Sequence, residues 1–181
     1  MTTIARDTLK LATTEAGVLG LLALDGERSG YDLSKQAEQS VGHVWAPTKS
    51  HLYAVLRRLS AQGLVSARLV AQDRRPDKQL YSLTEAGHAS LQAWLDAPPR
   101  GDQSGLVLRL FLGGLASAES HRRTLEAFRD DLLAQLEVYA EIDARNSRRG
   151  HDLFHGAVLD LGIARAEAAR AWADARLAEL R

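Results

Sequence analysis

The chain has 181 residues, no cysteine, and 23 cationic side chains balanced by 23 acidic ones, so its formal net charge is zero. This length fits one large domain or two small ones, and the lack of cysteine excludes disulfides, zinc ribbons and thiol-based sensing. The N-terminus has no signal-peptide core and no apolar run approaches the roughly 18 residues that span a bilayer, so we expect a soluble, cytoplasmic protein.

The first part of the chain predicts two helices joined by a turn. Residues 1–13 carry little pattern and are expected to form an arm. Residues 14–24 are apolar on most sides, which indicates a buried first helix. Residues 25–30 predict a turn, and residues 31–41 predict a second, more polar helix.

The third predicted helix spans residues 47–62, and its two faces differ in chemistry. Leu52, Leu56 and Leu59 recur at helical spacing and form an apolar stripe. Such a helix suits the major groove of DNA if its outer face is rich in donors, although an ordinary solvated amphipathic helix has the same pattern. The outer face carries cations and hydroxyls without a carboxylate: Lys49, Ser50, His51, Tyr53, Arg57 and Arg58.

A β-hairpin is predicted directly after this helix. Residues 64–71 and 80–83 have strand-like patterns, and residues 72–79 form a charged loop between them. Three helices followed by a hairpin are typical of a winged helix-turn-helix, whose wing lies against the DNA backbone or the minor groove. A solubilising loop would also be cationic. The cations of the loop are Arg74, Arg75 and Lys78.

Positive charge is concentrated in this part of the sequence. Residues 46–80 contain seven Lys or Arg residues and two Asp residues, which gives a net charge of +5 and leaves −5 for the rest of the chain. A local excess of this kind is expected when one surface of a neutral protein meets a polyanion.

A domain boundary is predicted near the middle of the chain. Residues 84–95 predict a helix, and the following residues, 96–103, combine proline, glycine and charge in the manner of a linker. We therefore expect an N-terminal domain over residues 1–97 and a second domain over residues 98–181. The expected fold is mainly α, with a winged helix-turn-helix that has a two-stranded wing, followed by an all-α dimerisation domain of long helices.

The second domain is predicted to contain a short helix, residues 106–112, and two long ones, residues 117–146 and 153–180. Apolar residues recur in both long helices at alternating three- and four-residue steps, which favours packing against a second copy of the chain. A self-contained three-helix bundle is the alternative. The residues expected at the dimer interface are Leu125, Phe128, Leu132 and Tyr139 in the first long helix, and Phe154, Val158, Leu161 and Trp172 in the second.

No pattern in the chain predicts an enzyme. A glycine-rich phosphate loop, a nucleophile elbow and a His-Glu-x-x-His metal motif are all missing from the sequence, so neither catalysis nor a cofactor is expected. His151 and His155 have the spacing of a metal-binding pair, but they lie at a predicted helix start, where histidines often cap or lie exposed. No metal site is predicted.

Four segments in order carry a resemblance to a known family. They are Gly30-Tyr31-Asp32-Leu33, then Ser50-His51-Leu52-Tyr53 with Leu56-Arg57-Arg58-Leu59, then Gly63-Leu64-Val65, and finally Tyr81-Ser82-Leu83-Thr84-Glu85-Ala86-Gly87. On these segments the N-terminal hundred residues resemble the PadR-type transcriptional regulators, a winged helix-turn-helix family. The long helical tail resembles the larger, virulence-activator-like subgroup, whose C-terminal helices build the homodimer.

The resemblance implies a homodimer that binds a pseudo-palindromic operator, usually as a repressor, and is often released by a small, frequently aromatic ligand. Residues Thr48, Lys49, Ser50, His51 and Tyr53 would then lie in or beside the major groove. Tyr31, Arg57 and Arg58 would meet phosphates, and Arg74, Arg75 and Lys78 would serve the wing. The wing tip departs from the family pattern, because Arg74 precedes Arg75-Pro76 where glycine is common.

Two questions stay open at the level of sequence. A winged helix can also act as a protein-interaction module without sequence-specific DNA binding, although such modules tend to expose apolar residues on the third helix. The effector site is not identified. Five aromatic residues are candidates for lining a cavity, with core or interface packing as the alternative for each: Trp45, Trp94, Tyr139, Phe154 and Trp172.

Overall fold

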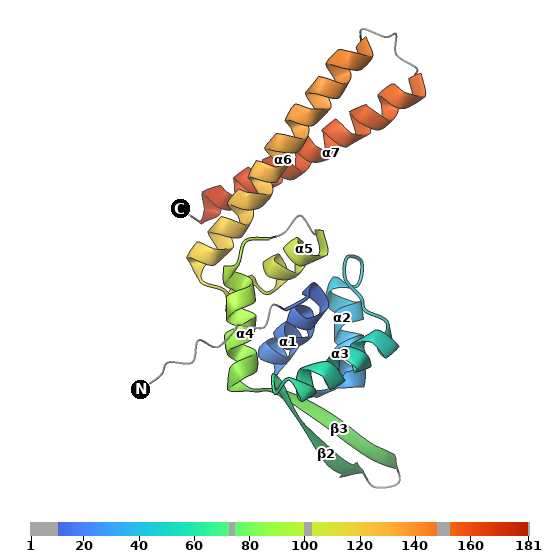
Figure 1. Cartoon of the computed structure of the whole chain (residues 1–181), viewed down its shortest axis with the longest axis vertical. Coiled ribbons are helices and arrows are strands. Elements are labelled where there is room, and N and C mark those ends of the chain that lie inside the picture. The colour runs from blue at the N-terminus through green and yellow to red at the C-terminus, as the bar shows by residue number, and fades with distance from the viewer. Residues whose placement is uncertain (1–10, 73–74, 100–102, 148–152, 181) are drawn as a thin grey trace. The chain divides into compact units, whose positions relative to one another are not determined.

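The computed structural model describes residues 11–72, 75–99, 103–147 and 153–180 (Figure 1). Two compact units make up the chain: Met1–Ala97 with Asp102–Ser117, and Pro98–Gly101 with Ala118–Arg181. The predicted mainly helical fold, with an N-terminal winged helix-turn-helix, is confirmed. None of the described helices combines the length and the apolar character that crossing a membrane requires.

The first unit contains five α-helices, a short 3-10 helix and three strands among its described residues. The helices are α1 (Thr13–Asp25), α2 (Gly30–Val41), α3 (Lys49–Ala61), α4 (Glu85–Asp96), α5 (Gln103–Phe111) and η1 (Gly113–Leu115). The strands are β1 (Arg28–Ser29), β2 (Val65–Gln72) and β3 (Arg75–Leu83).

Polar side chains and two glycines fix where these helices begin and end. Ser29 caps α2, since its Oγ accepts the N–H of Asp32 at 3.2 Å. Thr84 caps α4 in the same way, accepting the N–H of Gly87 at 3.1 Å. Gly26 and Gly63 follow α1 and α3 with φ values of 74° and 70°, a backbone conformation that side chains disfavour.

The sheet is larger than the two-stranded wing that we expected. Its strand order is β1–β3–β2, fully antiparallel, with Ser29 opposite Leu80 and Val70 opposite Lys78. The predicted turn at residues 25–30 therefore contains a short strand, and most of the predicted loop at residues 72–79 is strand. Pairing with β2 imposes this extended structure on a charged stretch that has little strand propensity of its own.

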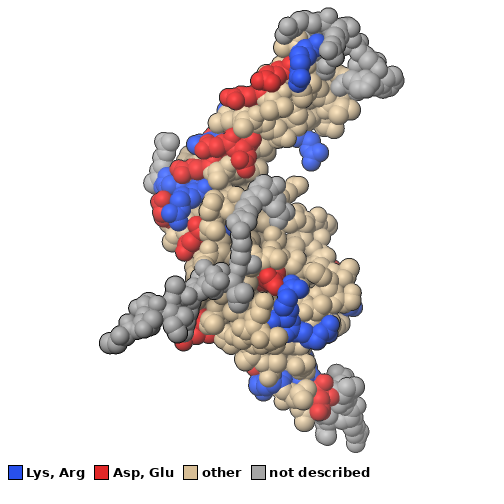
Figure 2. All heavy atoms as spheres, viewed as in Figure 1, with Lys and Arg blue, Asp and Glu red and all other residues tan. Residues whose placement is uncertain are grey.

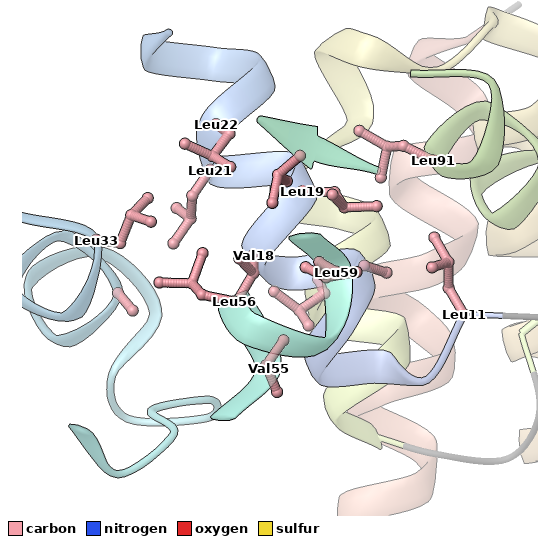
Figure 3. Close-up of a cluster of buried hydrophobic side chains, with 14 of the residues drawn as sticks. Leu11, Val18, Leu19, Leu21, Leu22, Leu33, Val55, Leu56, Leu59 and Leu91 are labelled. Carbon is pink, nitrogen blue, oxygen red and sulfur yellow. The ribbon is translucent and has the colours of Figure 1, made fainter. Parts of the chain in front are cut away.

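The core of the first unit surrounds α1 (Figure 3). The predicted stripe of α3 packs there, with Leu52, Leu56 and Leu59 fully buried. Gly17 of α1 makes room for a neighbour, because a Cβ atom at this position would lie 2.5 Å from the ring of Trp45. The loop that leads into α3 is thereby held against the central helix.

Helix α5 belongs to the first compact unit, although it follows the boundary expected between residues 97 and 98. Leu108 and Leu112 are buried in the core that surrounds α1. Leu112 occupies space that a Cβ atom on Gly20 would need, so α1 is shaped to receive it. The apolar side of α5 attaches these residues to the first unit in spite of the linker-like sequence before them.

The second unit is built from two long helices, α6 (Ala118–Ser147) and α7 (Leu153–Glu179), which pair with each other (Figure 1). Leu125 and Leu132 of α6 are buried in this pairing unit, as are Leu159, Ala166, Ala173 and Leu177 of α7. At one position Gly162 brings α7 close to α6, since a Cβ atom there would lie 3.0 Å from Tyr139.

The eight residues expected at a dimer interface therefore fall into different environments. Leu125 and Leu132 are already buried within one chain, because the stripe of α6 faces the same chain's α7. Phe128 meets Trp172 edge-on, with 6.5 Å between ring centroids. The stripe of α7 instead faces outward, with Val158 73% and Leu161 60% exposed. Phe154 begins this stripe, but its side chain lies outside the described residues.

Candidate nucleic-acid interface

The exposed end of α3 gathers the residues that were expected to read DNA. Thr48 precedes the helix, and its Oγ1 accepts the N–H of His51 at 3.3 Å. The same oxygen lies 3.2 Å from the hydroxyl of Ser50. Lys49, Ser50 and His51 are all exposed, so this short segment presents cationic, hydroxyl and imidazole groups together at a helix N-terminus.

Tyr31 of α2 lies beside this cluster. The Nζ of Lys49 lies 5.6 Å from the centroid of the Tyr31 ring, within the range of a cation–π contact. Tyr31 remains 59% exposed. Residues of α2 and α3 that are far apart in sequence thus form one surface, as the helix-turn-helix order predicts.

Further along α3, Arg57 and Tyr53 lie close to the wing. Burial raises the pKa of Tyr81 on β3, the nearby Tyr53 adds to this rise, and Arg57 opposes it. Arg57 is exposed, and no carboxylate among the described residues forms an ion pair with it. Its guanidinium is therefore available at the angle between α3 and the sheet.

Other cations of the basic segment are neutralised by carboxylates from α1, α2 and the turn between α1 and β1. The local charge excess that we inferred from the sequence is thus partly offset in space, where oppositely charged side chains lie side by side over α3 and the wing (Figure 2). The ion pairs are Arg58 Nε with Glu15 Oε1 at 2.6 Å, Arg68 Nε with Glu27 Oε1 at 2.7 Å, and Lys78 Nζ with Asp32 Oδ2 at 2.9 Å.

These pairs give Arg58 and Lys78 carboxylate partners within the chain, and the DNA contacts expected of both residues stay predictions. Arg58 was predicted to contact phosphate, but its Nε bonds to Glu15 and ties α3 to α1. Lys78 was predicted to serve the wing, and it joins β3 to the start of α2. The Lys78 ammonium, followed by the Ser29 hydroxyl, lowers the pKa of Asp32, so this carboxylate stays ionised at neutral pH.

The tip of the wing is only partly described. Arg74 lies outside the described residues. Arg75 is the first residue of β3, opposite Gln72 across a register shift, but its side chain is not among those described. The role expected for these two arginines stays a prediction.

Two exposed residues of α2 and the wing were not singled out from the sequence. Lys35 is exposed one helical turn after Tyr31 on α2. Leu69 on β2 is 70% exposed and lies opposite Gln79 of β3. The alternation of strand residues would have placed Leu69 on the face of Val65, but only the full length of the hairpin shows that this face extends beyond the core.

The candidate effector residues are all packed against identifiable neighbours where the structure describes them. Trp45 is buried against Gly17, and Trp172 meets Phe128. Tyr139 accepts a hydrogen bond from Gln135 at 3.0 Å and is also close to Gly162. Packing in the core or against a neighbouring helix therefore accounts for the positions of these residues.

Trp94 has a less ordinary neighbour, the guanidinium of Arg109, which lies 3.8 Å from its ring centroid. Arg109 is only 6% exposed, and burial lowers its pKa to about 10. Its Nη1 donates to the carbonyl oxygen of Trp94, but its Nε has no hydrogen-bond partner in the part of the chain that the structure describes. Among the described residues no carboxylate forms an ion pair with it.

The described residues contain no group of three or more side chains that could hold a metal ion. Of the histidine pair considered as a metal site, His151 lies outside the described residues. His155 is part of α7, but its side chain is not described.

Both halves of the chain match known protein families. Residues 18–93 match the "Transcriptional regulator PadR-like family", and residues 104–181 match "Virulence activator alpha C-term". A probable transcriptional regulator of Mycobacterium tuberculosis, Rv1176c, is 27% identical over 163 residues, which cover 81% of this chain and 86% of that protein. The negative transcriptional regulator PadR of Bacillus subtilis is 35% identical over 78 residues, 43% of this chain and 42% of PadR.

Solved structures to which the chain is similar include Bacillus subtilis PadR in complex with operator DNA, with a TM-score of 0.46 and 23% identity, covering 94% of this chain and all of that one. The Vibrio cholerae virulence activator AphA has a TM-score of 0.39 and 25% identity, covering 92% and 97% of the two chains. These relatives are regulators and not enzymes. The chain therefore combines a domain of the PadR-like family of transcriptional regulators with a virulence-activator-type C-terminal domain.

Proposed function

We propose that this regulator acts in the cytoplasm as a homodimeric repressor, which binds a pseudo-palindromic operator and is released by a small aromatic ligand. The observation that carries the proposal is the exposed cluster of Lys49, Ser50 and His51 at the start of α3. An α-helix fits the major groove of B-DNA, and these side chains offer donors and acceptors of the kind that read base edges. The solved complex of Bacillus subtilis PadR with operator DNA supports this reading.

Within this proposal the residues of α3 and the wing have different roles in binding DNA. Thr48, Lys49, Ser50, His51 and Tyr53 lie in or beside the major groove. Arg57 meets phosphate, because it is exposed and has no carboxylate partner among the described residues. At the wing tip, Arg74 and Arg75 approach the backbone or the minor groove.

A protein-interaction module is not favoured by the chemistry of this surface. Such a module would expose apolar side chains on α3, whereas Lys49, Ser50, His51 and Arg57 occupy the exposed positions. The four leucine and valine residues of the helix are buried: Leu52, Val55, Leu56 and Leu59.

The outward stripe of α7 supports the homodimer. Val158 and Leu161 are largely exposed, and Trp172, also on this stripe, is 43% exposed. Apolar residues repeated on one helix face are a common mark of helix association, and a two-fold dimer explains a palindromic operator. We place the half-sites about 10 base pairs apart, or a multiple of this spacing, as two-fold docking of recognition helices requires.

The effector is proposed from a relative and from one buried cation. A structure of Bacillus subtilis PadR contains p-coumaric acid, an aromatic acid. Here the Arg109 guanidinium and the Trp94 ring place positive charge and aromatic surface together, and Arg109 Nε lacks a hydrogen-bond partner among the described residues. An aromatic carboxylate would satisfy that donor and compensate the buried charge.

Selection of bound fragments from genomic DNA tests the central proposal. We expect recovery of fragments that share an inverted repeat, protected against cleavage by the purified protein. The eluted protein should be dimeric by light scattering. Recovery of fragments without a shared sequence would contradict an operator-specific regulator, and a monomer at micromolar concentration would contradict the dimer.

A further inference from the structure

The first turn of α2 contacts two side chains of α3 at once. The residues involved are Gly30 and Tyr31 of α2, and Lys49 and Tyr53 of α3. Lys49 and Tyr53 are four residues apart, so they lie on the same face of α3. A single dipeptide of α2 therefore borders the part of α3 that holds two of its DNA-reading candidates.

This dipeptide is itself held firmly in place. Ser29, immediately before it, caps α2 through its hydroxyl and pairs with Leu80 in the sheet. The carboxylate of Asp32, immediately after it, accepts the Ser29 hydroxyl at 2.7 Å and pairs with Lys78 of β3. Gly30 and Tyr31 are thus tied to the sheet on both sides.

The ring of Tyr31 lies within cation–π distance of the Lys49 ammonium. The Lys49 Nζ lies 5.6 Å from the Tyr31 ring centroid. An exposed lysine otherwise samples many rotamers, and the attraction between its ammonium and the ring face favours the rotamers that keep them together. The interaction depends on the ring, so the Tyr31 hydroxyl is not needed for it.

Gly30 supplies space for Tyr53. A Cβ atom at Gly30 would lie 2.5 Å from Cε1 and 2.9 Å from Cζ of Tyr53. The φ angle of Gly30 is not positive, so the backbone conformation does not require glycine here. What requires it is the close approach of the Tyr53 ring.

We propose that Gly30 and Tyr31 are positioning residues, which set the orientation of Tyr53 and Lys49 before DNA is bound. The inference rests on the proposed function, since it assigns to α3 the reading of an operator. It differs from the role that the resemblance implies for Tyr31, which is contact with phosphate. A tyrosine side chain would make such a contact through its hydroxyl, because the hydroxyl is its only hydrogen-bonding group. The two roles make opposite predictions for phenylalanine at this position.

The experiment compares Tyr31→Phe, Tyr31→Leu and Lys49→Gln on the selected operator and on copies with each base pair changed singly. We expect Tyr31→Phe to bind within about twofold of the natural protein with unchanged base preference, because its ring keeps the cation–π contact. Tyr31→Leu is expected to relax the preference at the same base pair as Lys49→Gln. The variant that combines Tyr31→Leu with Lys49→Gln is expected to lose no more base preference than Lys49→Gln alone. Gln39→Ala, on the exposed side of α2, is the control.

A phosphate contact would give a different result. Tyr31→Phe and Tyr31→Leu would then lose affinity alike and equally on all operator copies. That outcome would overturn the positioning role of Tyr31.

Gly30→Ala tests the second contact. We expect it to alter preference at the same base pair as Tyr53→Ala. If the collision with the ring unfolds the single variant, Gly30→Ala combined with Tyr53→Ala should refold and bind as Tyr53→Ala does. Gly30→Ala with natural preference and stability would overturn the role of Gly30.

Nuclear magnetic resonance of the free protein separates this inference from the proposed function. The ε-methylene protons of Lys49 should resonate upfield of an exposed lysine because of the Tyr31 ring. This shift should persist in Tyr31→Phe and vanish in Tyr31→Leu. Its absence from the natural protein would overturn the inference even if operator binding is found, and its presence would stand even if no operator is selected.

Discussion

Glu15 of α1 accepts a hydrogen bond from Arg58 of α3, with 2.6 Å between Oε1 and Nε. The other carboxylate oxygen of Glu15 accepts the backbone N–H of Ala12 at 2.8 Å, which caps α1. Glu15 is buried, whereas the Arg58 side chain is half exposed. One carboxylate thus stabilises the start of the central helix α1 and fixes α3 against it.

Arg58→Met should therefore lower stability more than operator affinity. The change leaves the buried Glu15 carboxylate without its cation, at a cost of about 1–2 kcal/mol in the free energy of unfolding. Urea denaturation measures this loss, and Glu15→Gln should show a similar one. A large loss of operator affinity with unchanged stability would contradict this expectation and indicate that Arg58 contacts DNA.

Arg57→Met, the neighbouring substitution, should have the reverse effect. Arg57 is exposed and not paired with a carboxylate among the described residues, so its removal should leave stability unchanged. Loss of one phosphate contact should reduce the slope of log affinity against log salt by about 0.9 and weaken binding similarly on all sequences. Titrations of operator DNA at several salt concentrations test this, with Arg58→Met as the matched control.

The ion pair of Asp32 and Lys78 should make part of the stability depend on pH. Because Lys78 and Ser29 lower the folded-state pKa of Asp32, the contribution is complete above the unfolded value, about 3.9, and is lost as pH falls through the lower folded value. The stability difference between the natural protein and Asp32→Asn should shrink correspondingly on acidification. A difference that stays constant between pH 7 and pH 2 would show that the pair contributes nothing through charge.

Leu161→Glu should dissociate the proposed dimer without unfolding the chain. Leu161 is largely exposed, so a carboxylate there meets water in the isolated protomer but apolar surface in the proposed interface. Light scattering should report the mass of one chain, and circular dichroism an unchanged helix content. Ala178→Glu places the same charge at an exposed position outside the stripe and should remain dimeric.

Arg109→Met should abolish effector release while preserving the fold. Replacing a buried guanidinium that lacks a carboxylate by an apolar side chain is expected to leave stability equal or higher. Operator release by p-coumaric acid, followed by fluorescence anisotropy, should disappear in the variant and be unaffected by Arg129→Met on α6. Release that is equally sensitive to the acid in Arg109→Met would move the effector site elsewhere.

The sequence predicted the parts of the fold that depend on local pattern. The stripe of Leu52, Leu56 and Leu59 located helix α3 and its buried side correctly, since helical periodicity is a local property. The length of β3 and the existence of β1 were missed because both depend on partners distant in sequence, such as Arg28 opposite Tyr81. Strand structure of this kind is imposed by pairing and not by composition.

The candidate site was predictable in its residue types but not in its charge balance. Counting charges along the chain hid the pairing of Arg58 with Glu15, which joins residues 43 positions apart. The contact between Tyr31 and Lys49 was hidden for the same reason. A stripe of apolar residues likewise does not state which helix covers it: that of α6 packs within the chain, and that of α7 faces outward.

The packing of Leu112 against Gly20 has a practical consequence for dissecting the protein. A DNA-binding fragment that stops at residue 97 would remove Leu108 and Leu112 and expose the glycine side of the central helix to water. The smallest fragment that keeps this helix covered ends after η1, near residue 117. The linker-like segment is therefore followed by residues that complete the core of the first unit. Truncation at this segment would expose that core to water.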